Sequence, residues 1–343
     1  MSRERQSPPA AVTGSIETAS GARRGGHGGG DLLARVLAIQ ELALITIIVI
    51  TAVGISLLSP YFLTIGNLRS ILIGAVPGAV IAVGMSILMV SGGFDLSVAG
   101  TMALGGTIVA YLMVNAVPLP LAIVATLILG VLIGVGNGVL VTYVRINPLI
   151  ATLGTMSVTR GLALVITEGY NISNLPSDFL IPGEQGPLGL PWMVWITLVL
   201  VITGDFALRR TRFLRQLYYI GGNERAARLS GIPVDPLKVF GYMASGLLAA
   251  LAGILLASRL NTAVPTAGQG LELTVIAAAV IGGASLAGGA GTVLGAVLGV
   301  LFLAQISNVL TLLSVSVFWQ TVVTGMLLLA AVTFDMFVRR RER

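Results

Sequence analysis

Long apolar blocks, separated by short polar or glycine-rich segments, make up most of this chain. Each block runs for about 17 to 23 residues, the length that an α-helix needs to cross the hydrocarbon core of a bilayer. The pattern therefore predicts about ten membrane-spanning helices. They cover approximately residues 42–58, 71–90, 97–115, 119–141, 148–167, 190–208, 239–257, 271–287, 291–313 and 317–338.

The eighth block is the least regular of the set. Glu272 lies at its start, and glycine-rich sequence interrupts its end. A helix broken in this way either crosses the membrane or turns back inside it. The sequence is compatible with residues 271–287 either crossing fully or turning back.

The composition favours helices that pack against other helices. Mean hydropathy is +0.96 and 55% of the residues are apolar, more than a soluble globular chain needs. The apolar blocks are also rich in Gly, Ala, Ser and Thr, which let membrane helices approach closely. We therefore predict an all-α, polytopic membrane domain over residues 39–338. A disordered cytoplasmic tail (1–38) precedes it, and a basic cytoplasmic C-terminus (339–343) follows it.

The basic residues favour an orientation with both termini in the cytoplasm. Lys and Arg accumulate in the cytoplasmic loops of membrane proteins, and an even number of spans returns the chain to the same side. The segment 168–189 carries only acidic charges and is expected outside, where Arg69 and Arg259 are two exceptions to the scheme. The segment 209–238, between the sixth and seventh blocks, is expected inside. Its basic residues are Arg209, Arg210, Arg212, Arg215, Arg225, Arg228 and Lys238.

Few residues are available for enzyme chemistry. The chain has no Cys, and its single His, His27, lies in the glycine-rich tail, so thiolate sites and His clusters are excluded. The P-loop of ATPases needs a Lys at the end of a glycine-rich loop, whereas the only Lys, Lys238, follows "PVDPL". The chain is therefore not expected to be an enzyme. Energy for transport must come from a second subunit or from an ion gradient.

The stretch "GGNERAARLSG", Gly221 to Gly231, gathers charge within an apolar chain. It predicts a short helix that begins at the cap Asn223, carries Glu224 at the positive end of its dipole, and ends at Gly231. Glu224 and Arg228 lie four residues apart and can pair on one face. A helix of about seven residues is unstable alone in water, so other groups must hold it.

Two interpretations of this short helix are open. In the first, it is a solvated loop helix whose arginines only enforce topology. In the second, it is a docking helix that presents Ala226, Ala227 and Leu229 to a cleft on a cytoplasmic partner.

Five motifs follow one another along the chain. They are "SGGFDLSVAG" (91–100), "NPLIATLGTM" (147–156), "IGGNERAARLSGI" (220–232), "GLELTVIAAAVIGGASLAGGAGTVLGA" (270–296) and "SNVL" (307–310). In this order they resemble the permease subunits of ribose-type and related sugar ABC importers. The resemblance covers approximately residues 40–338, and the order of the motifs is more specific than any one of them.

The resemblance implies that the short charged helix is the coupling helix, which sits in a groove of a separate ATP-hydrolysing subunit. That subunit binds ATP and Mg, and no cofactor or metal is expected in this chain. Other implied partners are an extracytoplasmic substrate-binding protein, a second permease chain in a homodimer or heterodimer, a small-molecule sugar and membrane lipid, but no nucleic acid. The implied location is the bacterial inner membrane. The expected coupling residues are Gly221, Gly222, Asn223, Glu224, Arg225, Ala226, Ala227, Arg228, Leu229 and Gly231.

Two glycine-rich segments hint at an internal duplication of half-domains. "GGFDL" (92–96) and "GGASL" (282–286) are each followed by Gly-Thr, at Gly100-Thr101 and Gly291-Thr292. Glycine-interrupted segments at corresponding places in two halves indicate a translocation path near the midplane, because broken helices offer backbone groups there. The same glycines are also typical of close helix packing, and both interpretations stay open.

A sugar path needs neutral polar groups and some aromatic faces, because fixed charges hold a substrate too tightly. Polar residues in membrane helices also bond to neighbouring helices. The candidates for the path are Phe94, Asp95, Ser97, Thr101, Asn147, Thr152, Thr155, Glu272, Gln305 and Asn308. A binding protein is expected to dock on the external segments 168–189 and 258–270, where the candidates are Glu168, Asp178, Glu184 and Arg259. The sequence does not name the sugar.

The main alternative function is an ion-gradient-driven secondary transporter of a small polar solute, and Asp95 is the residue on which this alternative depends. Such a transporter needs intramembrane acids that load and release protons or sodium ions, and Asp95 is the main candidate. Asp95 can instead cap the following helix or line the path. A channel is a further class, but it gives the basic segment no purpose.

Overall fold

The computed structural model describes residues 40–342 of the chain. The predicted cytoplasmic tail, residues 1–38, lies outside the described residues, as does Arg343. Within residues 40–342 the chain forms α-helices joined by short segments, with one antiparallel pair of two-residue strands. The predicted all-α fold class is confirmed.

Each predicted apolar block coincides with one helix in the described part of the chain. Six of these helices, namely α3, α5, α6, α8, α11 and α13, are long and apolar enough to cross a membrane. The total of about ten crossings stays a prediction. The bounds are α2 Gln40–Leu58, α3 Ile65–Val90, α4 Val98–Val114, α5 Leu119–Thr142, α6 Pro148–Thr167, α8 Trp192–Arg210, α11 Val234–Leu260, α12 Leu271–Ile281, α13 Val293–Leu312 and α14 Val317–Glu342.

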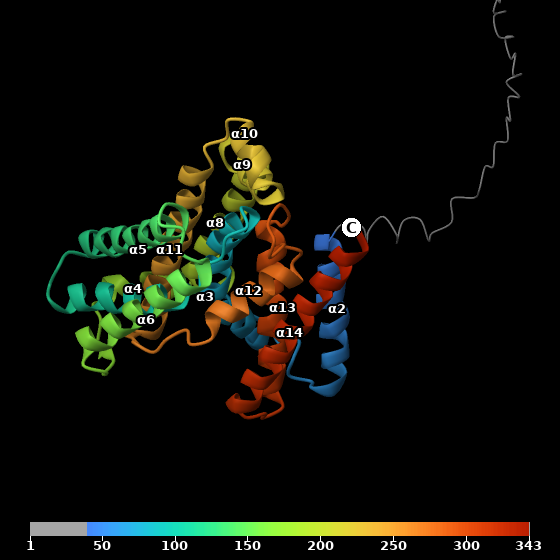
Figure 1. Ribbon diagram of the computed structural model, residues 1–343. Coiled ribbons are helices and arrows are strands. Elements are labelled where there is room, and N and C mark those ends of the chain that lie inside the picture. The colour runs from blue at the N-terminus through green and yellow to red at the C-terminus, as the bar shows by residue number, and fades with distance from the viewer. Residues whose placement is uncertain (1–39, 343) are drawn as a thin grey trace, which may run out of the picture.

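Short elements fill the connections at the two ends of the bundle. Helices α9 (Arg212–Gly222) and α10 (Glu224–Leu229) join α8 to α11 and lie at one end, on the side where α2 begins and α14 ends (Figure 1). The start of α2 and the end of α14 therefore lie on the same side of the bundle as α10. The opposite end carries β1 (Ile172–Ser173), α7 (Ser177–Leu180), the 3₁₀ turns η1 (Ile181–Gly183) and η2 (Pro187–Gly189), and β2 (Thr262–Ala263).

Helix α11 is the centre of the bundle, with α3, α4 and α5 packed around it. Its contact with α5 is made by three glycines spaced four residues apart, Gly130, Gly134 and Gly138. A Cβ atom at Gly134 would clash with the carbonyl oxygen of Tyr242 and lie 2.8 Å from the Cα of Met243. Such spacing lets two backbones approach closely, which stabilises helix pairs in a membrane where lipid is as apolar as the side chains.

The long helices differ in how much of their surface the protein covers. In the most apolar stretch of α3, 78% of the residues are buried, and in that of α11, 61%. The corresponding share is 22% in α5, α6 and α8. A helix that is apolar all round and buried belongs to the core, so α3 and α11 form the centre while α5, α6 and α8 keep faces open to lipid.

Helix α12 ends earlier than the sequence predicts. The predicted eighth helix runs to residue 287, but α12 ends at Ile281. Its 11 residues span about 17 Å, roughly half of the hydrocarbon core. The helix ends because Gly283, Gly288 and Gly289 adopt positive φ angles of 91°, 88° and 78°. The chain then continues toward the α10 side as a glycine-rich loop.

The two segments predicted as external docking surfaces form a single surface. Strands β1 and β2 pair with each other and so join the segment after α6 to the segment after α11. The side chain of Asn261 accepts a hydrogen bond from the N–H of Leu175 at 3.1 Å. The hydroxyl of Ser258 accepts one from the N–H of Gly183 at 3.2 Å. The end of α11 is thereby attached to the whole external segment 168–189.

Replacing Gly134 by alanine should force α5 away from α11, because the new Cβ has no room against the backbone of Tyr242 and Met243. The expected loss of stability is about 1–3 kcal/mol, which is typical of overpacking. Thermal unfolding in detergent measures it. The matched control is Gly136→Ala on the same helix, where nothing lies within 4 Å of an added Cβ. Equal melting temperatures for the two variants would contradict this packing.

Candidate functional site

Helix α9 lies along the end of the bundle as an amphipathic helix. Its buried residues Leu214, Leu217 and Ile220 are three apart, while Arg212 and Arg215 are exposed. An apolar stripe at this spacing packs a helix onto a surface and leaves its polar face open. Helix α9 therefore fixes the position of the shorter α10 that follows it.

The structure confirms the predicted short helix at α10, including its cap and its end. The side chain of Asn223 accepts a hydrogen bond from the N–H of Ala226 at 3.0 Å. Gly231 has a φ of +80°, in the left-handed region that favours glycine, and its N–H donates to the carbonyl oxygen of Arg228 at 3.1 Å. These contacts satisfy backbone groups that a helix of six residues leaves unpaired.

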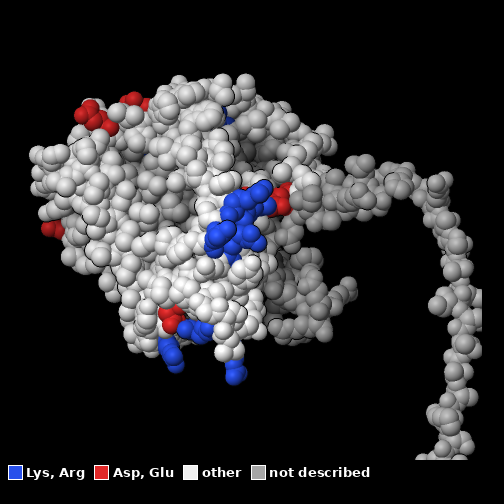
Figure 2. All heavy atoms as spheres, turned by 90° about the horizontal axis from the view of Figure 1, so that it is seen from above, with Lys and Arg blue, Asp and Glu red and all other residues white. Residues whose placement is uncertain are grey.

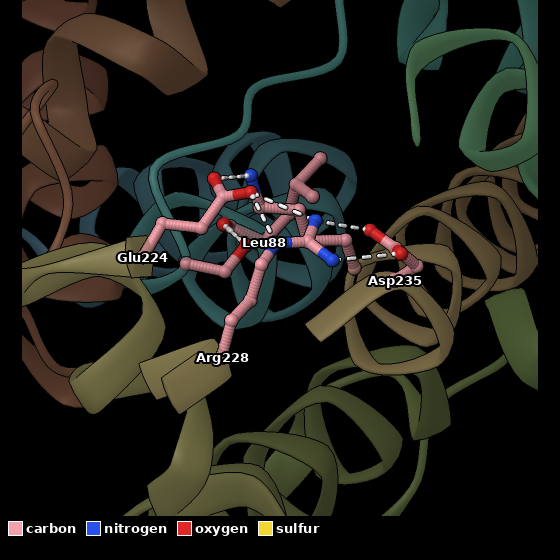
Figure 3. Close-up of polar contacts among 6 residues, drawn as sticks. Leu88, Glu224, Arg228 and Asp235 are labelled. Atoms are coloured by element: carbon pink, nitrogen blue, oxygen red, sulfur yellow. Dashed lines mark hydrogen bonds and ion pairs between the residues drawn. The ribbon is translucent and has the colours of Figure 1, made fainter. Parts of the chain in front are cut away.

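Charged side chains clamp α10 to the start of α11 (Figure 3). Arg228 pairs with Glu224 at 3.0 Å, as the spacing predicts, and also donates two hydrogen bonds to Asp235. Lys238 reaches Glu224 at 2.5 Å. Asp235 and Lys238 could not be predicted as partners, because they belong to the next helix and only the tertiary structure brings them to α10.

The clamp consists of ionised groups at neutral pH. The hydrogen bond from Lys238 lowers the pKa of Glu224 below its ordinary value of 4.5; partial burial opposes this effect, and the bond from Arg228 adds to it. The bonds to Asp235 raise the pKa of Arg228. An acid with a lowered pKa stabilises the folded state above its unfolded pKa and loses that contribution as the pH falls through the lowered value. The clamp is therefore complete above pH 4.5 and weakens only in stronger acid.

The structure corrects one residue of the proposed docking face. Ala227 is only 4% exposed and packs toward the bundle, so it is not available to a partner. Leu229 is 83% exposed, and Arg225 and Ala226 are also exposed. One face of so short a helix has to be anchored, and Ala227 provides that anchor. The open face of α10 therefore consists of Arg225, Ala226 and Leu229.

Helix α9 ends in a backbone contact with both glycine-rich loops, which we call the glycine junction. A Cβ at Gly221 would clash with the carbonyl oxygen of Val90 and with the nitrogen of Gly289. The N–H of Gly289 donates to the carbonyl of Val90 at 2.9 Å. A Cβ at Gly288 would lie 2.8 Å from the Cα atoms of both Gly221 and Gly92. The charged segment and the two helix breaks therefore meet at one point.

The two breaks differ in detail. The first lies between α3 and α4, and the second lies between α12 and α13. Thr292 caps α13 by accepting a hydrogen bond from the N–H of Gly295 at 3.0 Å. Thr101 instead lies inside α4, where its buried hydroxyl has no hydrogen-bond partner among the described residues. The internal duplication stays a prediction.

Asp95 is fully buried at the centre of a polar network. Its carboxyl oxygens accept hydrogen bonds from the N–H and hydroxyl of Ser97 at 2.9 and 2.6 Å, from the hydroxyl of Ser245 at 3.1 Å and from the amide of Asn137 at 3.4 Å. Asn137 also donates to the Ser97 hydroxyl at 2.8 Å and accepts from Thr155 at 2.6 Å. The bond from the N–H of Ser97 lies just before α4, whose cap residue Ser97 makes no side-chain cap hydrogen bond, so Asp95 holds the break and does not cap the helix.

Asn137 and Ser245 belong to this network although they were not among the predicted residues. The available signal was an isolated amide within the apolar stretch "LIGVGNGVL". A buried polar network whose members are all bonded fixes the relative positions of the helices that contribute to it. These residues come from α5, α6, α11 and the break before α4, so the network ties the first break to three helices.

Several path candidates make separate helix contacts. Asn147 caps α6 by accepting a backbone N–H at 2.9 Å. Gln305 of α13 donates to the hydroxyl of Thr51 in α2 at 3.0 Å. Asn308 of α13 exchanges two hydrogen bonds with Asn67 of α3, at 2.8 and 2.9 Å. These candidates therefore lie in different interfaces rather than in one cluster.

The other candidates are enclosed to different degrees. Thr152 is buried within α6, and Phe94 is half-buried in the first break. Glu272 is half-buried in the first turn of α12, and its Oε2 atom has no hydrogen-bond partner in the described part of the chain. None of the predicted path residues lines a described cavity, so their role in the path stays a prediction.

A cavity of about 300 Å³ lies between α12 and α14, and we call it the α12–α14 cavity. Five of the eight lining residues carry an amide or a hydroxyl group, although most of the lining surface is apolar, and no charged side chain takes part. The cavity was not predicted, although Gln320 and Thr324 lie one helical turn apart in the last apolar block. The lining residues are Gln269, Gly270, Leu273, Thr274, Gln320, Thr321, Thr324 and Gly325.

The four binding-protein candidates are exposed on the surface that β1 and β2 hold together. They comprise three acids and one base, and none of them forms an ion pair within residues 40–342. The surface therefore offers free charges to a partner. The residues are Glu168, Asp178, Glu184 and Arg259.

Residues 67–332 match the protein family described as "Branched-chain amino acid transport system / permease component". The ribose import permease protein RbsC of Escherichia coli (strain K12) is 41% identical over 300 residues, which cover 86% of this chain and 93% of that protein. RbsC of Bacillus subtilis (strain 168) is 43% identical over 289 residues, covering 83% and 89%.

A relative with a different named sugar is similar over the same extent. The L-arabinose transport system permease protein AraH of Escherichia coli (strain K12) is 38% identical over 304 residues, which cover 89% of this chain and 93% of that protein. No solved structure matches the chain. The similarity extends over almost all of the described helices, including both breaks and α10.

Replacing Asp95 by alanine should destabilise the protein by about 3 kcal/mol, because buried donors of Ser97, Asn137 and Ser245 lose their acceptor. Asp95→Asn should lose less, since its amide oxygen still accepts. Thermal unfolding measures both. Adding Ser245→Ala to Asp95→Ala should lower stability little further, because the two residues share one bond. Fully additive losses would contradict the network.

Proposed function

Because the chain belongs to the family of transport-system permease components, which it matches over residues 67–332, we propose that it is the membrane-spanning permease subunit of an ABC importer for a sugar. It is a multi-pass protein of the inner membrane and not itself an enzyme. The relatives named for ribose and for L-arabinose support a monosaccharide, or a similar small polyhydroxy compound, as the cargo.

The observation that carries this proposal is the glycine junction. An importer driven by a separate ATPase needs a cytoplasmic docking element that is connected to the helices of the path. Helix α10 leaves Arg225, Ala226 and Leu229 open, and the preceding Gly221 lies directly against both helix breaks. A force applied to α10 therefore reaches the two irregular parts of the membrane domain without an intermediate side chain.

The energy source of this mechanism is a partner that binds ATP and Mg. On the proposed orientation, α9 and α10 face the cytoplasm, where that subunit would enclose the open face of α10. A gradient-driven mechanism has less support, because the relatives are importer permeases and Asp95 is surrounded by hydrogen-bond donors that hold it in place. No described cluster of His, Cys, Asp or Glu could hold a metal ion.

Two further partners complete the proposed assembly. A second permease, either another copy of this chain or a sister chain, would provide the second docking helix for a pair of ATPase subunits. An extracytoplasmic binding protein would dock on the joined surface of β1 and β2, where Glu168, Asp178, Glu184 and Arg259 are free to pair with its charges.

The α12–α14 cavity is the part of the structure that best suits a sugar in transit. The polar part of its otherwise apolar lining consists of neutral amide and hydroxyl groups, which can bond to a polyhydroxy compound without holding it as tightly as a charge would. It begins beside the first turn of α12, the half-length helix that leads to the second break. We place Glu272 beside this path and assign the candidates Asp95, Ser97 and Thr155 to the separate polar network at the first break.

The coupling proposal is tested in nanodiscs that contain the permease, its ATPase subunit and its binding protein. Gly221→Ala should reduce substrate-stimulated ATP hydrolysis and uptake to about a tenth or less, because its Cβ pushes α9 away from both breaks. Glu224→Lys should have the same effect, since it places a cation between Lys238 and Arg228. Both variants should still insert into the membrane.

The control for Gly221→Ala is Gly222→Ala at the next position. Nothing lies within 4 Å of a Cβ at Gly222, so this variant should behave like the wild type. Normal uptake by Gly221→Ala and Glu224→Lys would overturn the coupling role. Uptake that follows a proton or sodium gradient and ignores the ATPase would overturn the proposed function itself.

The path proposal is tested by filling the cavity. Gly325 lines it and has nothing within 4 Å of an added Cβ, so Gly325→Phe should place a ring in the cavity without disturbing the helices. Uptake should fall at least tenfold while ATP hydrolysis continues, roughly as expected when passage but not coupling is blocked. Gly54→Phe on α2, which also has open space, is the control. Normal uptake by Gly325→Phe would place the path elsewhere.

A further inference from the structure

A groove of about 360 Å³ lies where α8 meets the start of α13, on the α10 side of the bundle. Its walls are of two kinds. Ile202, Phe206 and Leu294 are apolar, and Asp205, Arg209 and Arg210 are charged. A groove that is apolar along one part and cationic at its end matches neither a sugar nor a nucleotide, but it matches an amphipathic ligand.

The apolar part of the groove continues along the outer face of α8. Leu198, Val199, Ile202 and Phe206 follow one another at helical spacing, and Ile202 and Phe206 are 60% and 65% exposed. Helix α8 is long and apolar enough to cross a membrane. A stripe of large apolar side chains that no other part of residues 40–342 covers is therefore in contact with acyl chains, and it leads directly into the groove.

Of the two arginines that line the groove, Arg209 is already paired with acidic side chains of the protein. Arg209 lies between Glu41 of α2 at 2.5 Å and Asp205 at 2.8 Å. Glu41 also accepts a hydrogen bond from Thr292 at 3.0 Å, and Asp205 accepts one from the N–H of Leu294 at 3.1 Å. These bonds join α2, α8 and α13, so the cationic wall of the groove is held in a fixed position and the charge of Arg209 is compensated.

The other arginine is available to a ligand. Arg210 lines the groove, is exposed and forms no ion pair with any described residue. Arg212 and Arg215 follow on α9, are also exposed, and are likewise unpaired within residues 40–342. Figure 2, which looks onto this end of the bundle, shows basic side chains gathered in patches, with acidic side chains beside them, on a mostly uncharged face. The groove therefore ends in an excess of positive charge.

We propose that this groove is a binding site for an anionic phospholipid. The phosphate of the headgroup pairs with Arg210, and Arg212 adds to the local positive potential. One acyl chain occupies the groove between Phe206 and Leu294 and continues along Ile202. A guanidinium group matches phosphate oxygens in a two-pronged geometry, which favours a phosphate over a zwitterionic headgroup whose own cation competes for it.

Topology alone does not account for this arrangement. Basic residues that only orient a helix need to lie at its cytoplasmic end, without a groove or a fixed neighbour. Here the groove is walled by residues of α8 and α13, and the same side chains hold the contact with α2. A bound lipid would therefore stabilise the junction of the three helices. The site depends only on membrane insertion and is independent of which cargo is carried.

The proposal is tested on the full chain purified in a neutral detergent. Dioleoylphosphatidylglycerol should raise the melting temperature and remain bound in native mass spectra, whereas dioleoylphosphatidylcholine at the same concentration should do neither. Arg210→Ala should weaken the apparent affinity for phosphatidylglycerol about fivefold, which is the effect of one arginine at an anionic membrane surface. Arg225→Ala, which removes an equal charge from α10, is the control and should leave the affinity unchanged.

Three outcomes would overturn the proposal. Equal stabilisation by the two lipids would show that the groove has no preference for an anionic headgroup. If Arg210→Ala and Arg225→Ala weaken the affinity for phosphatidylglycerol equally, the lipid is attracted to the whole basic face and not to the groove. Loss of ATPase binding in Arg210→Ala without any change in lipid retention would assign the arginine to the interface with that subunit. Failure of any of these tests leaves the coupling experiments unaffected.

Discussion

Close approach of helix backbones at glycine positions is the constraint on which the rest of this structure depends. Lipid is as apolar as the side chains, so helices in a membrane gain little from burying apolar surface and associate through packing and hydrogen bonds. Gly134 brings α5 onto α11, and Gly221, Gly92 and Gly288 bring α9 onto both breaks. The contact surfaces are therefore made of main chain, and a single added methyl group is enough to disturb them.

That closeness also explains where the polar side chains lie. Once helices touch at their backbones, short side chains such as Ser245 and Thr155 can reach across an interface to a carboxyl or amide group. Asp95 is consequently satisfied by three neighbours within a space that admits no solvent, and its carboxyl group is part of the architecture. The α12–α14 cavity is different, because none of the residues that line it is charged.

The helices and α10 could be predicted from sequence because their signals are local. Apolar length marks each helix, and Asn223 and Gly231 mark the ends of α10. The parts that escaped prediction depend on contacts between distant segments. The burial of Ala227, the pairing of Lys238 with Glu224 and the cavity all arise when different helices come together. The early end of α12 could be predicted only in part, because the sequence contains the glycines but does not reveal their positive φ angles.

Helix α11 connects the two docking surfaces as one continuous rod. At one end Asp235 and Lys238 hold α10, and at the other Ser258 and Asn261 hold the external segment. Its 27 residues extend about 40 Å, and they contain no proline or break after the first turn. In the proposed importer, a tilt imposed by a binding protein outside would appear at α10 at once, with no relay of separate switches. The tilt angle of α11 would then report the arrival of cargo outside and, at the same time, set the position of α10 for ATP hydrolysis inside.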